Sequence, residues 1–273
     1  MHFISGLPRS GSTLLAAILR QNPGFHAAMT SPLGSLFDTV LAQLSAGSEF
    51  GPMVNQEQRK ALLSGLFSSY YQKDIDKSVI FDTNRSWCSK LPALLGLFPD
   101  AKVICCVRDV AWIMDSLERQ YQKNPFEHTR LFNNATERNT VYSRVDTLGQ
   151  RDRMVGFAWC ALKEAVYGDH AGALLLVDYE LLTRSPADVL SLIYQFIDEP
   201  FFEHDFKNIE YDAPEFDQQL GLEGLHRVHP VVSPANRKTL LPPDLFETYS
   251  SMSFWHDLSA SKANVIAPEK RKE

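Results

Sequence analysis

Short apolar runs alternate along the chain with segments whose apolar residues recur at helical spacing. The strand-like runs cover residues 2–5, 78–81, 102–107 and 173–177, and a fifth candidate covers 25–29. Continuous apolar strands that alternate with helices are typical of a parallel sheet covered on both faces. The pattern therefore predicts an α/β fold, a three-layer sandwich around a central parallel sheet of four to five strands.

Start signals mark several of the intervening helices. Ser31-Pro32 and Ser185-Pro186 each combine a favoured N-cap residue with proline at the first helical position. Asn55 and Asp109 are further expected N-caps. Residues 123–149, in contrast, are polar and lack a strong period, so we predict a mobile excursion there.

No repeat, low-complexity tract or linker divides the 273 residues. We predict a single domain over residues 1–258 and a flexible polar tail over 259–273. No run reaches the roughly 20 apolar residues of a membrane helix, and no secretory signal precedes the first strand. If Met1 is the natural start, these features favour a cytoplasmic protein with no membrane span.

Composition narrows the classes of function. Hydrophobic residues make up 44% of the chain and charged residues 22%, as in ordinary globular proteins. The net charge of −6 provides no overall field for nucleic acid or an anionic membrane, but it is compatible with a local basic pocket for a small anion. The cysteines lack metal-ligand spacing and are expected to be buried reduced thiols: Cys88, Cys105, Cys106 and Cys160.

A glycine-rich loop follows the first strand, and apolar residues at helical spacing follow the loop. Glycines five positions apart allow successive backbone N–H groups to turn around one anion, and the next helix adds its positive end. We expect the anion to be a phosphate. The residues predicted to bind it are Pro8, Arg9, Ser10, Gly11, Ser12 and Thr13.

The loop departs from that of a nucleotide triphosphatase in one informative way. Ser12 stands where such enzymes carry their lysine, and the cation is Arg9, inside the loop. The sequence therefore predicts a P-loop-like fold that binds a ligand with fewer phosphates and needs no metal.

Residues 7–14 resemble the 5′-phosphosulfate loop of sulfotransferases that use 3′-phosphoadenosine-5′-phosphosulfate (PAPS). In motif style they are closest to tyrosylprotein-sulfotransferase-like and bacterial sulfotransferases. The resemblance implies that Arg108, which leaves the strand at 102–107, and Ser116 bind the 3′-phosphate of the donor. It also implies that Tyr179, in a strand–Tyr–Glu–x–Leu segment, packs beside the adenine.

Sulfuryl transfer needs cationic donors at the leaving 5′-phosphate oxygen and a base for the acceptor proton. Arg9 and Arg85, which follows the strand at 78–81, are the predicted cations. Asp38, His226 and His229 are the candidates for proton transfer. The glutamate pair of tyrosylprotein sulfotransferases is missing from residues 26–31, which weakens the case for a tyrosine acceptor.

The resemblance implies metal-independent transfer of a sulfuryl group from PAPS to an acceptor hydroxyl or amine. The acceptor is a small molecule, a glycan or a peptide, and a homodimer is compatible with the sequence. Two alternatives stay open. A P-loop kinase would share the glycine spacing, and residues 174–178 resemble its Walker B strand, which ends in a magnesium-binding aspartate. A non-catalytic module would bind the nucleotide without transferring a group.

Overall fold

A computed structural model describes residues 1–123, 126, 129–220, 224, 226–234 and 237–268. Its centre is one sheet in which every strand pairing is parallel, in the order β2-β3-β1-β4-β5-β6. The predicted α/β sandwich is confirmed, with six strands rather than four to five. The strands are β1 (His2–Gly6), β2 (Phe25–Ala27), β3 (Val79–Thr83), β4 (Val103–Val107), β5 (Leu174–Asp178) and β6 (Asn264–Ile266).

The additional strand, β6, lies inside the segment expected to be a polar tail. It pairs with β5 through Leu176↔Val265 and its neighbours, and only Ile266 of its three side chains is buried. A strand of three residues at the edge of a sheet needs little apolar sequence, because backbone hydrogen bonds to a buried neighbour hold it. Residues 269–273 lie outside the described part of the chain.

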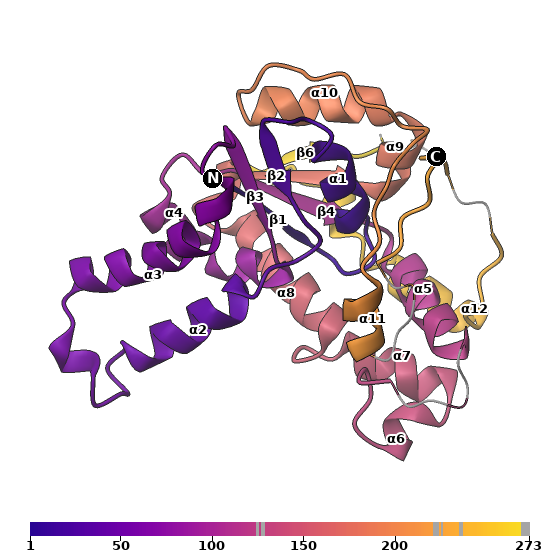
Figure 1. Ribbon diagram of the computed structural model, residues 1–273. Coiled ribbons are helices and arrows are strands. Elements are labelled where there is room, and N and C mark those ends of the chain that lie inside the picture. The colour runs from indigo at the N-terminus through magenta and orange to yellow at the C-terminus, as the bar shows by residue number, and fades with distance from the viewer. Residues whose placement is uncertain (124–125, 127–128, 221–223, 225, 235–236, 269–273) are drawn as a thin grey trace.

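Each face of the sheet carries its own layer of helices (Figure 1). Alternate residues of a strand point to opposite faces, so Phe3 and Cys105 belong to one core while Ile4 and Cys106 belong to the other. The Ile4 face is covered by α1 (Ser12–Leu19), α9 (Tyr179–Arg184) and α10 (Pro186–Phe196). The Phe3 face packs on α2 (Leu33–Gln43), α3 (Gln56–Tyr70), α4 (Leu91–Leu97), α5 (Val110–Lys123), α7 (Val141–Gly149), α8 (Met154–Tyr167) and α12 (Pro243–Ser250).

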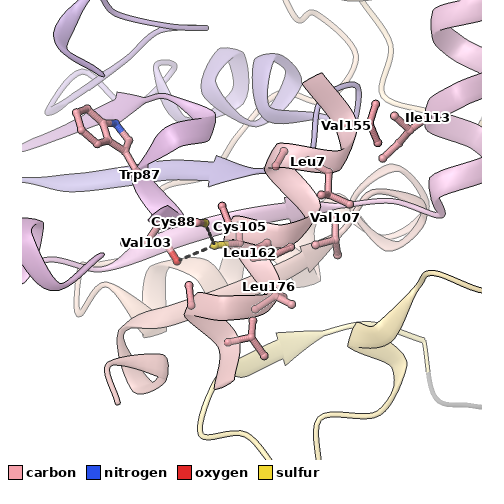
Figure 2. Packing of buried hydrophobic residues seen from close by; sticks show 14 of the residues in the cluster. Leu7, Trp87, Cys88, Val103, Cys105, Val107, Ile113, Val155, Leu162 and Leu176 are labelled. Carbon is pink, nitrogen blue, oxygen red and sulfur yellow. Dashed lines mark hydrogen bonds between the residues drawn. The ribbon is translucent and has the colours of Figure 1, made fainter. Parts of the chain in front are cut away.

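The cysteines of the Phe3 core lie deep beneath the site described below. Figure 2 shows Cys88 beside Cys105, with the two sulfur atoms 3.6 Å apart and both side chains buried. Cys106 is also buried, as predicted, whereas Cys160 is partly exposed, and all four are free thiols. Burial raises the pKa of Cys106 to about 12, so its thiol stays protonated.

The predicted helix starts are largely confirmed by their caps. The Asn55 side chain accepts a hydrogen bond from Gln58 N, and the Gln58 side chain accepts one from Asn55 N, which completes a capping box on α3. Asp109 Oδ1 accepts hydrogen bonds from the first amides of α5. Ser185 precedes α10 as expected, although its side chain makes no capping bond.

The excursion predicted at residues 123–149 contains two helices, α6 (Ala135–Arg138) and α7. Val145 and Leu148 of α7 are buried in the Phe3 core. Two apolar positions are too few to show a helical period in the sequence, so the helix was not predicted. Arg144 makes a buried ion pair with Glu118 of α5 at 2.6 Å, which fixes α7 to α5. Residues 124–125 and 127–128 lie outside the described part.

The remaining elements are short. Within the described residues, no helix combines the length and apolar character that a membrane span requires. The elements not yet named are α11 (Pro214–Leu220) and the 3₁₀ helices Gly51–Met53, Gln72–Asp74, Arg85–Lys90, Ala171–Ala173 and Phe254–His256.

Candidate active site

A cleft of about 880 Å³ opens at the carboxyl edge of the central strands. β1 and β4 are neighbours in the sheet, but the chain continues from β1 to β2 on one side of this pair and from β4 to β5 on the other. The loops that leave β1 and β4 therefore diverge and create a crevice. The described residues that line the cleft include several arginines and a lysine but no aspartate or glutamate, although the chain as a whole has a net charge of −6. These side chains are Arg9, Arg85, Arg108, Arg119, Lys123, Arg130, Arg227 and Arg237.

The loop after β1 is held against β4 by its own backbone and by Ser10. Leu7 N donates to Cys106 O at 2.9 Å, and Ser10 Oγ donates to the same oxygen at 2.8 Å. Gly6 has φ of 101°, and a Cβ there would lie 2.2 Å from Cys106 O. Arg9 also has a left-handed backbone, with φ of 58°, which L-residues adopt at a cost. The anchored loop therefore holds a strained conformation that turns Arg9 toward the cleft.

Gly11 joins this loop to α1 and to the end of β5. Its φ is 95°, and it precedes the first residue of α1, Ser12. A Cβ on Gly11 would lie 2.7 Å from the Tyr179 ring. The α1 N-terminus, Pro8, Ser12, Thr13 and the Tyr179 ring thus all border the same cleft.

Arg9 bridges the two motifs predicted from the sequence. Its Nε donates a hydrogen bond to Ser116 Oγ on α5 at 3.1 Å. Burial lowers the pKa of Arg9, and the nearby guanidinium of Arg108 lowers it further. Arg9 and Ser116, which are assigned to opposite ends of one donor, therefore touch each other across the cleft, and the positive charges of Arg9 and Arg108 repel. An anion between the guanidiniums would relieve that repulsion.

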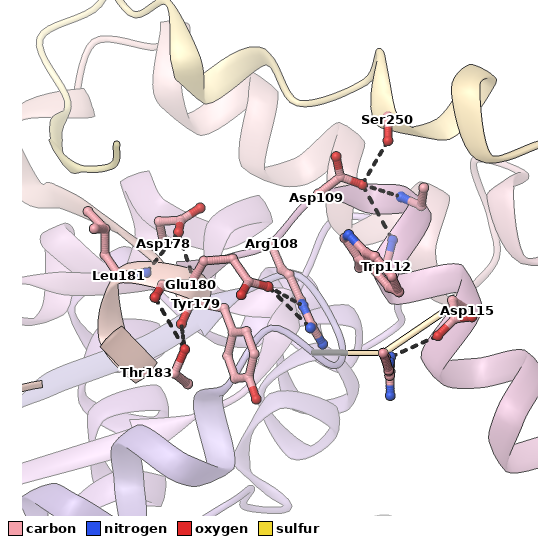
Figure 3. A network of polar contacts seen from close by, with 12 residues as sticks. Arg108, Asp109, Trp112, Asp115, Asp178, Tyr179, Glu180, Leu181, Thr183 and Ser250 are labelled. Carbon is pink, nitrogen blue, oxygen red and sulfur yellow. Dashed lines mark hydrogen bonds and ion pairs between the residues drawn. The ribbon is translucent and has the colours of Figure 1, made fainter. Parts of the chain in front are cut away.

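Arg108 leaves β4 as predicted and is held from two sides (Figure 3). Glu180 Oε1 lies 3.2 Å from both Nε and Nη2, and the Tyr179 ring lies below the guanidinium at 4.2 Å from its centroid. Asp178 Oδ1 caps α9 by accepting hydrogen bonds from Glu180 N and Leu181 N, which fixes the segment that carries Glu180. The end of β5 thus positions the cation at the end of β4.

Arg237 is a cleft cation that the sequence analysis missed. It reaches the site from an irregular segment and lies over the Trp112 ring at 5.6 Å. Among the described residues neither its Nε nor its Nη2 has an aligned hydrogen-bond acceptor, although Nη2 lies 2.9 Å from Asp115 Oδ2. Burial lowers the pKa of Arg237, and Arg108 and Arg119 lower it further. The only sequence signal is that residues 224–243 hold five basic or histidine residues and no acidic one.

Asp115 anchors this segment to α5. The carboxylate is fully buried and accepts hydrogen bonds from Arg119 Nε at 3.0 Å, Thr239 Oγ1 at 3.2 Å and Leu240 N at 2.6 Å. Arg119 also donates to the Lys238 carbonyl. One buried carboxylate thus holds two cleft cations, Arg119 and Arg237, in place.

Arg85 begins the 3₁₀ helix after β3 and lines the cleft, as its predicted role requires. No hydrogen bond or ion pair of its side chain is found among the described residues, and desolvation lowers its pKa. The neighbouring Asp82 does not orient Arg85. It is buried and accepts hydrogen bonds from Tyr71 Oη at 2.6 Å and Trp87 Nε1 at 2.7 Å.

The three candidates for proton transfer lie in different places. Asp38, on α2, makes an ion pair with Lys90 at 2.9 Å and is not among the residues that line the cleft. His229 is exposed at the cleft wall. Its neighbour His226 also lines the cleft and is partly buried, with its Nδ1 2.5 Å from Asp217 Oδ1.

Comparison with protein families agrees with this geometry. A family model described as "Sulfotransferase family" matches residues 2–203, which include the loop, Arg85, Arg108, Ser116 and Tyr179. The chain belongs to the sulfotransferase family. A search of curated proteins gives no significant match.

Solved sulfotransferase structures share the fold at low sequence identity. The sulfotransferase domain of the Synechococcus PCC 7002 olefin synthase is 21% identical, with a TM-score of 0.51 and 94% of each chain covered. The sulfotransferase domain of the curacin biosynthetic pathway is 15% identical, with a TM-score of 0.50 and coverage of 94% and 93%. A sulfotransferase from Alicyclobacillus acidocaldarius is 13% identical, with a TM-score of 0.50 and coverage of 80% and 88%.

Proposed function

We propose that this sulfotransferase uses PAPS as its donor and transfers the sulfuryl group to a hydroxyl or amine without a metal. The observation that carries the proposal is the convergence of guanidiniums from the ends of β1, β3 and β4 on one cleft. Burial lowers the pKa values of Arg9 and Arg237, and repulsion from Arg108 lowers both further, which fits a ligand with several negative charges. PAPS carries such charge at two separate positions, its 3′-phosphate and its 5′-phosphosulfate.

The assignment of residues follows their origin in the fold. The loop amides, the hydroxyls of Ser12 and Thr13, and the N-terminus of α1 bind the 5′-phosphosulfate, while the Ser10 hydroxyl holds the loop to Cys106 O. Arg108, Ser116 and Arg237 bind the 3′-phosphate, with Glu180 and Asp115 holding the two arginines. Tyr179 lies between the two groups, where an aromatic ring packs beside the adenine.

The chemistry follows from where charge develops. As the acceptor oxygen or nitrogen attacks sulfur, the bond from sulfur to the 5′-phosphate oxygen breaks and that oxygen gains negative charge. Arg9 and Arg85 stabilise it, because fixed cations in a partly desolvated cleft need little reorganisation. The acceptor, a small molecule, a glycan or a peptide, enters the remainder of the cleft in line with the leaving oxygen.

The kinase alternative is disfavoured by how Asp178 is used. In a P-loop kinase the acidic residue at this strand end serves the magnesium ion. Here the Asp178 carboxylate caps α9 at 2.9 and 3.1 Å, and Ser12 replaces the phosphate-binding lysine.

The donor assignment is tested by thermal unfolding with adenosine 3′,5′-bisphosphate, the product that PAPS leaves. At about 100 times its dissociation constant a ligand adds roughly 2.7 kcal/mol to stability, so we expect a clear rise in Tm. Adenosine 5′-monophosphate, which lacks the 3′-phosphate, should give a smaller rise. A rise with ATP and Mg²⁺ but none with the bisphosphate would contradict the proposal.

The role of Arg108 is tested in the same assay. Arg108→Ala should abolish most of the rise in Tm on ligand addition, whereas Arg108→Lys should retain part of it. The ligand-induced shift is compared, rather than the starting Tm, because Arg108→Ala also leaves Glu180 unpaired. Arg151→Ala, at an exposed position, is the matched control and should keep the full shift.

A further inference from the structure

A histidine–aspartate pair stands at the wall of the cleft. Asp217 lies on α11 and is fully buried, while His226 follows in the irregular chain and borders the cleft. The pair is joined twice: Asp217 Oδ1 lies 2.5 Å from His226 Nδ1, and Asp217 Oδ2 accepts a hydrogen bond from His226 N at 2.9 Å. This double contact fixes both the position and the rotation of the imidazole.

The geometry also selects the tautomer. A buried carboxylate facing Nδ1 favours the form that carries its proton on Nδ1, so the lone pair lies on Nε2. Among the described residues no hydrogen bond to this Nε2 is found. The Phe216 ring packs edge-on to the imidazole at 5.4 Å and limits its rotation.

His226 lines the same cleft as Arg9 and Arg85. Asp217 favours the protonated imidazole, whereas Arg9 and Arg85 both disfavour it. These two arginines are the cations assigned above to the leaving oxygen. Burial is the largest influence, and the pKa of His226 is lowered overall, so the imidazole is neutral at pH 7 and able to accept a proton.

We propose that His226 is the general base of the transfer and that Asp217 is its positioning residue. The inference rests on the proposed use of PAPS. Nε2 takes the proton of the acceptor O–H or N–H while the acceptor atom forms its bond to sulfur. The sulfur–oxygen bond to the 5′-phosphate breaks, and its electron pair stays on the phosphate oxygen. The other two candidates predicted from the sequence are less suited, because Asp38 is paired with Lys90 away from the cleft and His229 has no carboxylate partner among the described residues.

Release of adenosine 3′,5′-bisphosphate from PAPS, with water as the acceptor, provides a test that needs no known substrate. The wild-type rate should rise with pH through the pKa of His226 and then level off. His226→Gln should lower the rate at least about 100-fold and abolish the rising limb, since general bases contribute about 10²–10⁴-fold. His170 is exposed and does not line the cleft, so His170→Gln should leave the rate within twofold.

Asp217→Asn separates positioning from simple support of the fold. The amide keeps the shape but removes the charge that favours the protonated imidazole, so the rising limb should move to lower pH and the rate should fall about tenfold. A variant that only loosened the structure would lower the rate without moving the limb.

The donor and the base fail in different ways. If the bisphosphate does not bind the wild-type protein, the use of PAPS is wrong. If His226→Gln binds the bisphosphate with unchanged affinity and releases it from PAPS within threefold of the wild-type rate, only the base assignment is overturned. The same holds if His229→Gln, and not His226→Gln, abolishes the rising limb.

Proton NMR of the imidazoles provides a second readout without turnover. Binding of the anionic bisphosphate should raise the pKa of His226 by at least about half a unit and leave that of His170 unchanged. An unchanged His226 pKa on binding would place the imidazole out of reach of the donor and overturn the proposal.

Discussion

The two halves of the cleft are built in different ways. One half comes from strand ends: the loop after β1, Arg108 after β4 and Tyr179 after β5 are set by the hydrogen-bonded register of the central sheet. The other half comes from residues 198–241, which we call the covering segment and which contain α11 as their helix. The covering segment packs on the cores through apolar side chains such as Ile209 and Leu241, and polar anchors, each made by one or two side chains, fix it further.

Three of these anchors illustrate the contrast. Gln21 exchanges two hydrogen bonds with the Asp205 backbone, both at 2.9 Å. His204 Nε2 lies 3.0 Å from Tyr194 Oη, and Asp115 gathers the chain around residues 237–240. The strand-end half is thus fixed by the backbone pairing of the sheet, whereas the covering segment is fixed by side-chain contacts to several elements.

The largest effect is expected in the strand-end half. Gly6→Ala would place a Cβ 2.2 Å from Cys106 O on a residue whose φ is 101°. Backbone of the central strands cannot move away, so we expect a loss of about 4 kcal/mol or failure to fold. Urea unfolding measures it. Gly96→Ala, in a helix with no atom within 4 Å of the added Cβ, should be neutral or stabilising. Equal midpoints for the two variants would show that the loop is not rigid.

A smaller effect is expected at the anchor between the two halves. Asp115→Ala removes a fully buried carboxylate and leaves Arg119 and Arg237 without it, which should cost about 3 kcal/mol. Because Arg237 also loses its position, the affinity for adenosine 3′,5′-bisphosphate should fall as well. Urea unfolding and calorimetric titration measure the two effects. Asp100→Ala, at an exposed position, is the control, and an Asp115→Ala protein with unchanged ligand affinity would contradict the anchoring role.

The smallest effect concerns pH and the covering segment. Burial lowers the pKa of His204 from 6.5 to about 4, so the folded protein resists its protonation. The unfolded chain takes up that proton first, and stability should therefore fall as the pH decreases from about 6.5 to 4. The expected contribution is as much as about 2–3 kcal/mol. His204→Gln should flatten the stability curve in this window, whereas His170→Gln should not. A curve unchanged by His204→Gln would show that the segment opens around this residue.

The same division explains what could be predicted from the sequence. The four main strands, the fold class and the residues of the loop could be predicted from local sequence, because short apolar runs indicate buried strands and glycine spacing indicates an anion-binding loop. Arg108 and Ser116 were named because the strand–Arg–Ser arrangement resembles that of sulfotransferases, and both line the cleft. Most of the strand-end half of the cleft could therefore be predicted from the sequence.

The rest depends on contacts that no local pattern records. Arg237 reaches the cleft only because Asp115, far away in sequence, holds its segment. His226 could be named as a candidate base from the sequence, but no local pattern shows its pairing with Asp217, which comes from α11. The strand β6 was also missed, because its pairing with β5 is made by backbone atoms rather than by apolar side chains.

The position of β1 in the middle of the sheet has a consequence for how the protein is made. His2 pairs with Phe81 and Phe3 pairs with Val103, so the strand that carries the anion-binding loop waits for about a hundred residues of chain before both its neighbours exist. Such long-range parallel pairing folds slowly and leaves apolar strand edges exposed during synthesis. The anion-binding loop, although its residues begin near position 6, therefore reaches its place in the sheet only after β4 has been synthesised.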